Sequence, residues 1–280
     1  MIPPIADRFV AGESKTAAIE HAKALNRKDI GAILNLLGEH YHEPEPAGED
    51  RDAYLDLIRS VDAADVDAVV SVKPSQIGID VGEGTFRENL EDIVSIADTR
   101  DVFVWVDMED HETTDVTLDA YVDLATEYEG GVGLCLQSNL KRTREDLERV
   151  ADVPGRIRLV KGAYDEPADI AYKKKSKVNE MFRQDLEYMF ANFEDRAGIA
   201  VGSHDQQMID HAIDLAEEHD RDFEFQMLMG VRDDEQERLA RQGYTVYQYV
   251  PYGEKWFQYF YRRIRERKEN LLFAARAVLG

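Results

Sequence analysis

Cysteine and long hydrophobic runs are almost absent from this sequence of 280 residues. Its single cysteine, Cys135, excludes an intrachain disulfide and a cysteine-based zinc cluster, which is typical of reducing compartments. No uninterrupted apolar run approaches the roughly 18 residues that cross a bilayer, and residues 1–14 lack the basic and apolar regions of a signal peptide. We therefore expect a cytoplasmic chain with at most peripheral contact to the inner face of a membrane.

Basic residues are also few. The chain has 34 Lys and Arg residues against 57 Asp and Glu residues, which gives a formal net charge of −23. Such a polyanion repels phosphate backbones, so nucleic-acid binding is not expected. The acidic residues are spread along the chain, a pattern typical of folded proteins in high salt, where screening weakens their mutual repulsion. The charge therefore predicts a halophilic protein, and an ordinary acidic protein is the alternative.

Glycine-rich phosphate loops of the GxGxxG or GxxxxGK[ST] type are missing, which argues against an open, doubly wound sheet. Short apolar runs alternate instead with amphipathic, charge-rich stretches, as in repeated strand–helix units. The eight apolar runs lie in residues 32–41, 67–78, 102–110, 131–139, 156–164, 198–205, 223–230 and 244–253. Eight strands, each followed by a helix, predict a single (βα)8 barrel domain over residues 1–280.

Helix positions follow from the same pattern. A leading helix is predicted from Lys15 to Asn26, ahead of the first strand, and a last helix follows the eighth strand. Thr117, Thr143 and Asp205 each stand just before an apolar-periodic stretch, where a side-chain oxygen can cap free N–H groups. We therefore expect these three residues to be N-caps.

Polar side chains end most of the predicted strands, where a barrel carries its chemistry. They are Lys73, Asp107, Glu109, Gln137, Arg158, Lys161, His204, Glu224, Gln226, Gln248 and Tyr249. Lys73 and Arg158 facing Asp107 would compensate for the burial of one another's charge. Because alternate strand residues point to opposite sides, Arg158 faces the lumen only if Lys161 does not, unless a bulge intervenes. The alternative for each residue alone is a solvated rim position.

Arg262 and Arg263 stand side by side in the last predicted helix, after a run of aromatic residues. Two guanidinium groups are a good receptor for a carboxylate. Consecutive helical residues diverge by about 100°, so both reach one ligand only if this helix lies over the barrel mouth. We expect that placement.

Six segments in the same order resemble the proline dehydrogenase family of flavoenzymes, which has a distorted barrel. They are VSVKPSQIG, VWVDMEDHETTDVTLDAY, LCLQSNLKRT, RLVKGAY, FEFQMLMG and YVPYGEKWFQYFYRRIRER. The resemblance implies a monofunctional, haloarchaeal-type enzyme that oxidises L-proline to Δ1-pyrroline-5-carboxylate. It also implies FAD as the hydride acceptor, a quinone-type compound as the final acceptor, and a separate pyrroline-5-carboxylate dehydrogenase.

The resemblance also assigns site residues. Lys73, Arg262 and Arg263 would hold the substrate carboxylate, and Asp107 would pair with Lys73. The other substrate residues implied are Tyr164, Leu228, Tyr249 and Glu266. The cofactor residues implied are Gln137, Arg158, Val160, Lys161, Gly162, His204 and Gln226. Gln248 departs from the family pattern, in which a basic residue is common at this position.

Other classes remain open. Lys73 or Lys161 at a strand end could form a Schiff base, as in a class I aldolase, once desolvation lowers its pKa. A metal-dependent hydrolase is suggested by Asp107, Glu109, Asp110, His111 and His204, but alternation prevents their convergence and no HxH motif occurs. We therefore predict no metal. Glu109 and Glu112 are expected at the solvated rim and Cys135 in the core. A non-catalytic scaffold is the last alternative.

Overall fold

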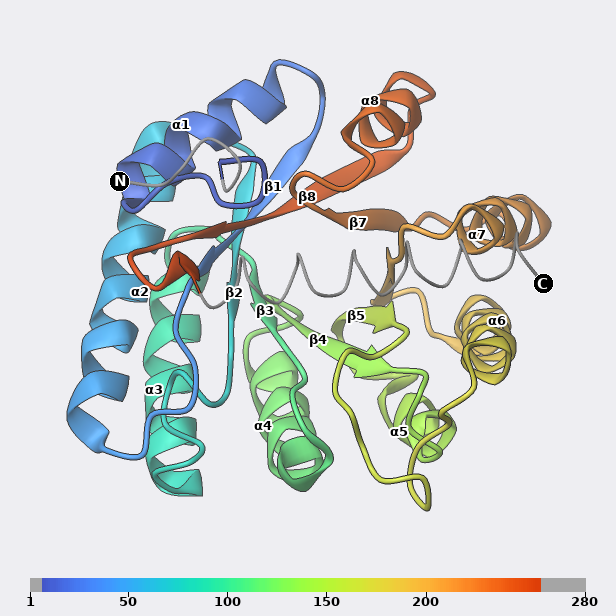
Figure 1. Cartoon of the computed structure of the whole chain (residues 1–280), viewed down its shortest axis with the longest axis horizontal. Coiled ribbons are helices and arrows are strands. Elements are labelled where there is room, and N and C mark those ends of the chain that lie inside the picture. The colour runs from blue at the N-terminus through green and yellow to red at the C-terminus, as the bar shows by residue number, and fades with distance from the viewer. Residues whose placement is uncertain (1–6, 258–280) are drawn as a thin grey trace, which may run out of the picture.

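The protein folds around a closed barrel of eight parallel strands in which each strand pairs with its neighbours in the chain and β8 pairs with β1. The computed structural model describes residues 7–257 (Figure 1). The strands are β1 (Gly31–Leu36), β2 (Ala68–Val72), β3 (Val104–Val106), β4 (Val132–Gln137), β5 (Gly155–Val160), β6 (Ala197–Gly202), β7 (Glu224–Leu228) and β8 (Thr245–Tyr252). The predicted (βα)8 barrel is confirmed.

Helices form the outer ring of the barrel (Figure 1). They are α1 (Lys15–Asn26), α2 (Pro44–Ala64), α3 (Glu83–Asp98), the short 3-10 helix η1 (His111–Thr113), α4 (Thr114–Glu127), α5 (Thr143–Val150), α6 (Lys175–Asn192), α7 (Gln206–His219) and α8 (Asp233–Arg241). The leading helix has the predicted bounds. The last predicted helix falls mostly beyond residue 257, outside the described residues, so its position over the mouth stays a prediction.

One of the three predicted N-caps is confirmed. Asp205 caps α7, and its side chain accepts a hydrogen bond from the Gln207 N–H at 3.1 Å. Thr117 lies inside α4, and its hydroxyl donates to the Thr113 carbonyl of the preceding turn. Thr143 is the first residue of α5, and its hydroxyl donates to the Gln137 carbonyl. These two predictions are wrong because each helix begins earlier than its apolar pattern indicates.

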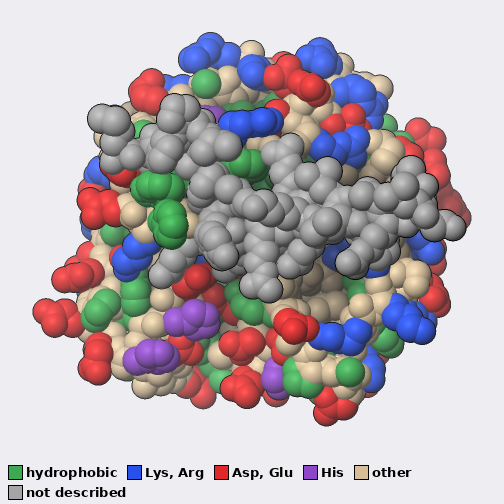
Figure 2. All heavy atoms as spheres, viewed as in Figure 1, with side chains coloured by type: hydrophobic (Ala, Val, Ile, Leu, Met, Phe, Trp, Pro, Cys, Tyr) green, Lys and Arg blue, Asp and Glu red, His purple; other side chains and the backbone are tan. Residues whose placement is uncertain are grey.

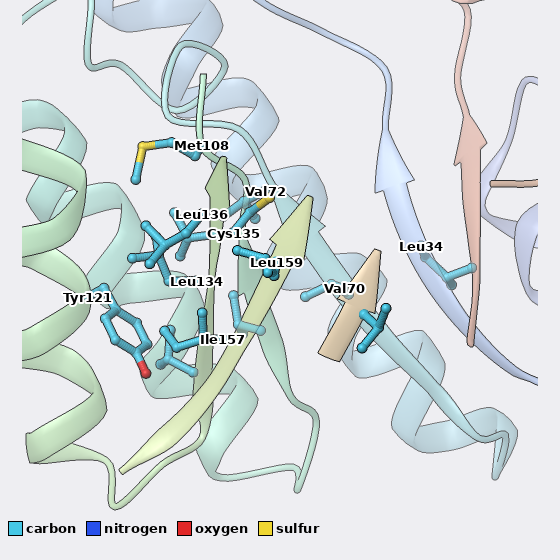
Figure 3. Close-up of a cluster of buried hydrophobic side chains, with 14 of the residues drawn as sticks. Leu34, Val70, Val72, Met108, Tyr121, Leu134, Cys135, Leu136, Ile157 and Leu159 are labelled. Carbon is cyan, nitrogen blue, oxygen red and sulfur yellow. The ribbon is translucent and has the colours of Figure 1, made fainter. Parts of the chain in front are cut away.

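The main apolar core lies between the barrel and the helices. Figure 3 shows Leu134 of β4 and Ile157 of β5 beside Tyr121 of α4, and all three side chains are buried. Cys135 is buried as well, which confirms its predicted burial. Alternate strand residues point outward into this layer, and the residues between them point into the barrel.

The barrel interior holds large side chains beside very small ones. Trp105 and Phe103 of the β3 region contact one another with ring centroids 5.2 Å apart. A Cβ at Gly133 would stand 2.6 Å from the Trp105 ring, so only glycine leaves space for the indole. Aromatic rings therefore fill much of the interior, together with smaller apolar side chains such as Ile33 and Val69.

The surface is strongly acidic, as the composition requires. Figure 2 shows Asp and Glu side chains spread over the visible face, with Lys and Arg side chains between them. In residues 7–257 no helix combines the length and the apolar character that a membrane span needs. The predicted dependence on high salt stays a prediction.

Candidate active site

A pocket opens at the carboxyl ends of the strands, where barrel enzymes carry their chemistry. Its empty volume, the open mouth included, is about 1070 Å³, and every strand or the segment after it contributes to the wall. The lining residues are Asn35, Lys73, Asp107, Met108, Glu109, Cys135, Arg158, Val160, Lys161, Gly162, Ala163, Tyr164, Gly202, His204, Gln226, Met227, Leu228 and Tyr249. The wall is mainly apolar with a few polar groups, as in small-molecule sites.

Most of the predicted site residues meet in this pocket. Among those in residues 7–257, only Gln137 is not part of the wall. Gln137 is buried next to it, and its amide donates to the Glu109 carbonyl at 2.7 Å. Arg262, Arg263 and Glu266 lie outside the described residues, so their roles stay predictions.

Asp107 is the centre of a hydrogen-bond network in the wall. Its Oδ1 accepts hydrogen bonds from the Arg158 guanidinium and, at 2.9 Å, from the Ser71 hydroxyl. Its Oδ2 accepts from the Tyr249 hydroxyl at 2.7 Å. The expected pair of Asp107 with Lys73 is wrong, because Lys73 Nζ pairs with Glu39 Oε2 at 3.0 Å. Asp107 therefore fixes Arg158 and Tyr249 instead of the lysine.

The network keeps Tyr249 and Arg158 in single protonation states. Burial and the adjacent Asp107 carboxylate raise the pKa of Tyr249 well above its usual value, so this side chain remains a phenol. Burial disfavours the Arg158 cation, but Cys135 and Asp107 outweigh this effect and raise its pKa. The guanidinium carbon lies 5.0 Å from the Trp105 ring centroid, in a cation–π arrangement. The site thus holds a permanent cation beside a neutral phenol.

Both Arg158 and Lys161 line the pocket, although strand alternation predicted only one of them there. The strand β5 ends at Val160, and Gly162 adopts φ 98°, a left-handed conformation that favours glycine. The chain turns at that point, so alternation no longer decides where Lys161 points. A Cβ at Gly162 would stand 2.0 Å from Asn139 Oδ1. Glycine is therefore required for both space and conformation.

Lys161 and His204 are each held by a contact with a neighbouring segment of the chain. Lys161 Nζ pairs with Asp205 Oδ2 at 2.6 Å, and this same carboxylate caps α7. Burial acts to raise the pKa of Asp205, but Lys161 and the Gln207 N–H hold it below its ordinary value. His204 Nε2 accepts from the Leu228 N–H at 2.8 Å, which requires an unprotonated Nε2.

Glu109 was expected at the solvated rim, and this expectation is wrong. Glu109 is only 2% exposed. Its carboxylate accepts hydrogen bonds from the Ser75 N–H at 2.7 Å and from the Ser75 hydroxyl at 2.9 Å. The Tyr164 hydroxyl donates to it at 3.3 Å. Burial raises the pKa of Glu109, although the Ser75 hydrogen bonds and Lys73 oppose the rise. Glu109 lies beyond the end of β3 at Val106, so strand alternation could not have indicated this position. Glu112 is exposed, as expected.

Two further polar residues of the site were not predicted from the sequence. Asn35 is buried in the wall, and its amide donates to the Ser71 carbonyl at 2.9 Å and the Tyr54 hydroxyl at 3.3 Å. A lone polar residue inside an apolar run was its only signal. Glu39 lies beyond the end of β1, and no sequence pattern joins it to Lys73.

Several groups in and beside the wall suit a flavin. Arg158 and Gln226 offer fixed polar groups, and Lys161 adds a cation near the backbone of Gly162. Asn139 Oδ1, which lies next to Gly162, is buried and has no hydrogen-bond partner among the described residues. An acceptor left without a donor suits a ligand rich in hydroxyl or N–H groups. These residues fit FAD.

A metal ion has no comparable set of donors in the part of the chain that the structure describes. No group of three or more His, Cys, Asp and Glu side chains there could hold one. Glu109 is bonded to Ser75, and His111 Nδ1 lies 2.6 Å from Glu166 Oε2. The metal-hydrolase alternative thus has no site in residues 7–257.

Comparisons with known proteins point to one family. The family model described as proline dehydrogenase matches residues 18–276. A proline dehydrogenase of Deinococcus radiodurans is 39% identical over 282 residues, which cover 98% of this chain and 90% of the relative. Proline dehydrogenase 1 of Bacillus subtilis strain 168 is 35% identical over 279 residues, with the same coverage of 98% and 90%.

Solved structures share the fold. Proline utilization A from Bdellovibrio bacteriovorus, inactivated by N-propargylglycine, superposes with a TM-score of 0.85 at 22% identity. The match covers 92% of this chain and 32% of that chain. Proline utilization A from Corynebacterium freiburgense gives a TM-score of 0.81 at 23% identity, covering 96% and 31%. The chain thus spans about a third of these longer proteins.

Proposed function

Because the chain belongs to the proline dehydrogenase family, we propose that it oxidises L-proline to Δ1-pyrroline-5-carboxylate, with FAD as electron carrier and a quinone-type compound as final acceptor. The observation that carries this proposal is the Asp107 network, which fixes Arg158 and Tyr249 in one mainly apolar pocket that also contains Lys73. Such a pocket suits a small cyclic amino acid with one carboxylate and an apolar ring.

Substrate binding divides between a charged and an apolar part of the pocket. Lys73 supplies an ammonium for the carboxylate, and the family resemblance adds Arg262 and Arg263. Tyr249 and Leu228 supply wall surface for the ring, and Tyr164 lies close by with its hydroxyl on Glu109. Rigid placement of this kind lowers the entropy cost of reaching the reactive geometry. The Tyr249 hydroxyl donates a hydrogen bond to Asp107 and stays protonated, so Tyr249 would position the substrate ring and would not act as a base.

Oxidation removes a hydride from the ring carbon next to nitrogen and a proton from nitrogen, and a C=N bond forms. The step is easier from the neutral amine, whose lone pair enters the new bond. The cations Lys73 and Arg158 line the same pocket and favour loss of the ammonium proton.

The cofactor residues proposed are Gln137, Arg158, Val160, Lys161, Gly162, His204 and Gln226. When bound, FAD would supply the two-electron acceptor that the side chains lack. Arg158 would offer its guanidinium to the ring system, and Lys161 would offer a positive charge to the phosphates. Gln137 would act from behind the pocket wall, since its amide is already bonded to the Glu109 carbonyl.

The aldolase alternative is less well supported. An imine-forming lysine reacts as the neutral amine, usually in a desolvated pocket. Lys73 and Lys161 instead have carboxylate partners, Glu39 at 3.0 Å and Asp205 at 2.6 Å. Borohydride with a carbonyl substrate is therefore expected to leave both lysines unmodified, as peptide mass analysis would show.

The direct test is an assay with purified protein, FAD, L-proline and a soluble quinone. We expect quinone reduction together with a product that forms the coloured adduct of Δ1-pyrroline-5-carboxylate with o-aminobenzaldehyde. Lys73→Met should raise KM for L-proline more than it lowers kcat, since it removes binding to the carboxylate. Protein that binds FAD but leaves L-proline unchanged would contradict the proposal. A separate pyrroline-5-carboxylate dehydrogenase is proposed as the consumer of the product.

A further inference from the structure

A chain of charged and polar groups runs through the barrel interior below the pocket. Arg156 Nη1 donates to Glu224 Oε2 at 2.9 Å, and Glu224 Oε1 accepts from Gln226 Nε2 at 2.6 Å. Gln226 Oε1 accepts from Arg158 Nη1 at 2.9 Å, and Arg158 Nη2 donates to Asp107. The hydrogen bonds therefore connect the amino-terminal end of β5 to the wall of the pocket without a gap.

The charges along this chain alternate in sign. Arg156 and Arg158 are cations on the same face of β5, and Glu224 supplies the carboxylate between them. Glu224, Gln226 and Arg158 are buried. Arg156 lies over the Phe103 ring at 4.6 Å, and a Cβ at Gly198 would stand 2.9 Å from its Cγ. The glycine at position 198 therefore leaves room for the charged side chain of Arg156.

Barrel interiors are usually filled with branched apolar side chains. A buried ion pair is weak evidence for stability, because desolvation can exceed the gain from attraction. The apolar shell outside the strands already provides the main core of this protein. The charged chain therefore calls for a role beyond packing, and its end at Arg158 and Asp107 points to the site.

Gln226 links Glu224 to the site through the direction of its amide. An arginine can only donate hydrogen bonds and a carboxylate can only accept them. The Gln226 oxygen must therefore face Arg158, and its nitrogen must face Glu224. This orientation follows from the neighbours alone and does not depend on how the two amide atoms are assigned. Arg158 itself thus sets the orientation of the amide, and Glu224 holds its nitrogen end in place.

We infer that Glu224 is a positioning residue for proline oxidation, which fixes the Gln226 amide and through it the Arg158 guanidinium at the floor of the pocket. The inference rests on the proposed function for its role in catalysis, but the effect on Arg158 can be measured without FAD. Glu224 does not itself line the pocket. It acts through Gln226, and its charge balances the two arginines.

The variant E224Q removes the carboxylate and introduces an amide that can donate as well as accept. Gln226 then loses the charged acceptor that holds its nitrogen, and Arg158, still bonded to Asp107, loses a rigidly held partner. The variant E224D keeps the charge but is one carbon shorter, so it cannot bond both Arg156 and Gln226 at the original distances. We expect a large effect from the first variant and an intermediate effect from the second.

Asp146 offers a matched control outside the barrel. Asp146 lies on α5, and its ion pair with Arg142, just before that helix, has the same 2.9 Å separation as the pair of Arg156 with Glu224. The side chains are 7% exposed for both carboxylates and 34% and 39% exposed for the two arginines. D146N therefore removes a buried carboxylate of the same kind with no connection to Arg158.

Trp105 reports the position of Arg158 in the FAD-free protein, because the guanidinium lies over its ring. The sequence has two tryptophans, so W256F leaves Trp105 as the only tryptophan, and selective excitation of tryptophan reads its emission alone. In that background we expect E224Q to change the emission intensity of Trp105, E224D to change it less, and D146N to leave it unchanged. Equal emission from E224Q, E224D and the parent would overturn the inference. If E224Q does not fold, the comparison of E224D with the parent decides in the same way.

The FAD-loaded full-length protein gives the second readout. E224Q removes a negative charge that is linked through Gln226 to the pocket wall, so the midpoint potential of the bound flavin should rise. Displacement of Arg158 should lower kcat roughly 10- to 100-fold with a smaller change in KM for L-proline. D146N should lower only the unfolding temperature. Potentials and kcat values that match the parent in E224Q would show a structural role alone. Failure of the parent to oxidise L-proline would contradict the proposed function, while the emission test would still decide the inference.

Discussion

The two faces of the same eight strands differ sharply. Outward residues such as Leu134 and Ile157 form an apolar layer against the helices, whereas inward residues such as Asp107, Arg158 and Glu224 carry charge. The outer layer gains stability from burial of apolar surface, roughly 25 cal/mol per Å². The inner face gains little stability from its ion pairs but fixes groups at defined positions. Stability and chemistry are thus assigned to alternate residues of one strand.

The strongest test of this division is removal of Asp107. D107A leaves the buried Arg158 cation without its carboxylate, a change that costs about 3–5 kcal/mol in other buried pairs. It also releases Tyr249, so kcat/KM for L-proline should fall about 100-fold or more. Urea unfolding and steady-state kinetics on the folded protein measure the two effects. A variant with parental kinetics would remove Asp107 from the centre of the site.

A substitution in the outer layer should affect stability alone. I157A creates a cavity between the barrel and α4, and the unfolding free energy should fall by about 2–5 kcal/mol. Because Ile157 points away from the pocket, kcat and KM should stay at the parental values below the unfolding transition. A loss of kcat as large as that of D107A would show that the two faces are not independent.

The buried carboxylate of Glu109 should make the unfolding free energy depend on pH, whereas an exposed carboxylate should not. Burial raises the pKa of Glu109 in the folded state above its ordinary value of 4.5. Between the ordinary pKa and the raised pKa, the folded protein binds more protons than the unfolded chain. The unfolding free energy therefore decreases as pH rises through this range. E109Q should lack this part of the decrease, and E112Q, at an exposed site in the neighbouring helix η1, should keep it. Urea unfolding at several pH values from 4.5 upward checks this result. A constant difference between E109Q and the parent would contradict it.

The smallest effect is expected at the outer surface. Arg87 pairs with Glu83 at 2.8 Å and with Asp123 at 2.9 Å, where all three side chains are in contact with water. Solvent screens such pairs, so R87A should lower the unfolding free energy by less than about 1 kcal/mol. Added salt should reduce the difference further. Urea unfolding at low and high salt measures both values, and a loss as large as that of D107A would contradict this ranking.

The sequence was sufficient for the barrel, because strand and helix periodicities repeat eight times without a long gap. It also placed most pocket residues, since polar side chains at strand ends must meet at one end of a barrel. Side-chain partners were harder to predict. Lys73 was assigned to Asp107, but Glu39 comes from a separate loop and Arg158 reaches Asp107 across the lumen. Such distances depend on barrel geometry, which a linear pattern does not contain.

Local exceptions account for the other errors. Strand alternation ceased to apply at Val160, where β5 ends, so Lys161 joined Arg158 in the pocket. Glu109 was assigned to the rim because carboxylates usually contact water, yet Ser75 compensates for its burial with two hydrogen bonds. Thr117 was placed as a cap because the apolar pattern of α4 starts later than its backbone hydrogen bonding. In each case a short-range contact outweighed a general tendency.

The central claim is that this pocket joins a flavin to L-proline. An anaerobic titration of the FAD-loaded protein with L-proline, followed by visible absorbance, tests it most directly. We predict that the flavin band bleaches with one equivalent of L-proline, and that D107A needs far more time to reach the same end point. A flavin band that stays unchanged in the presence of L-proline, or a protein that takes up no FAD, would contradict the account.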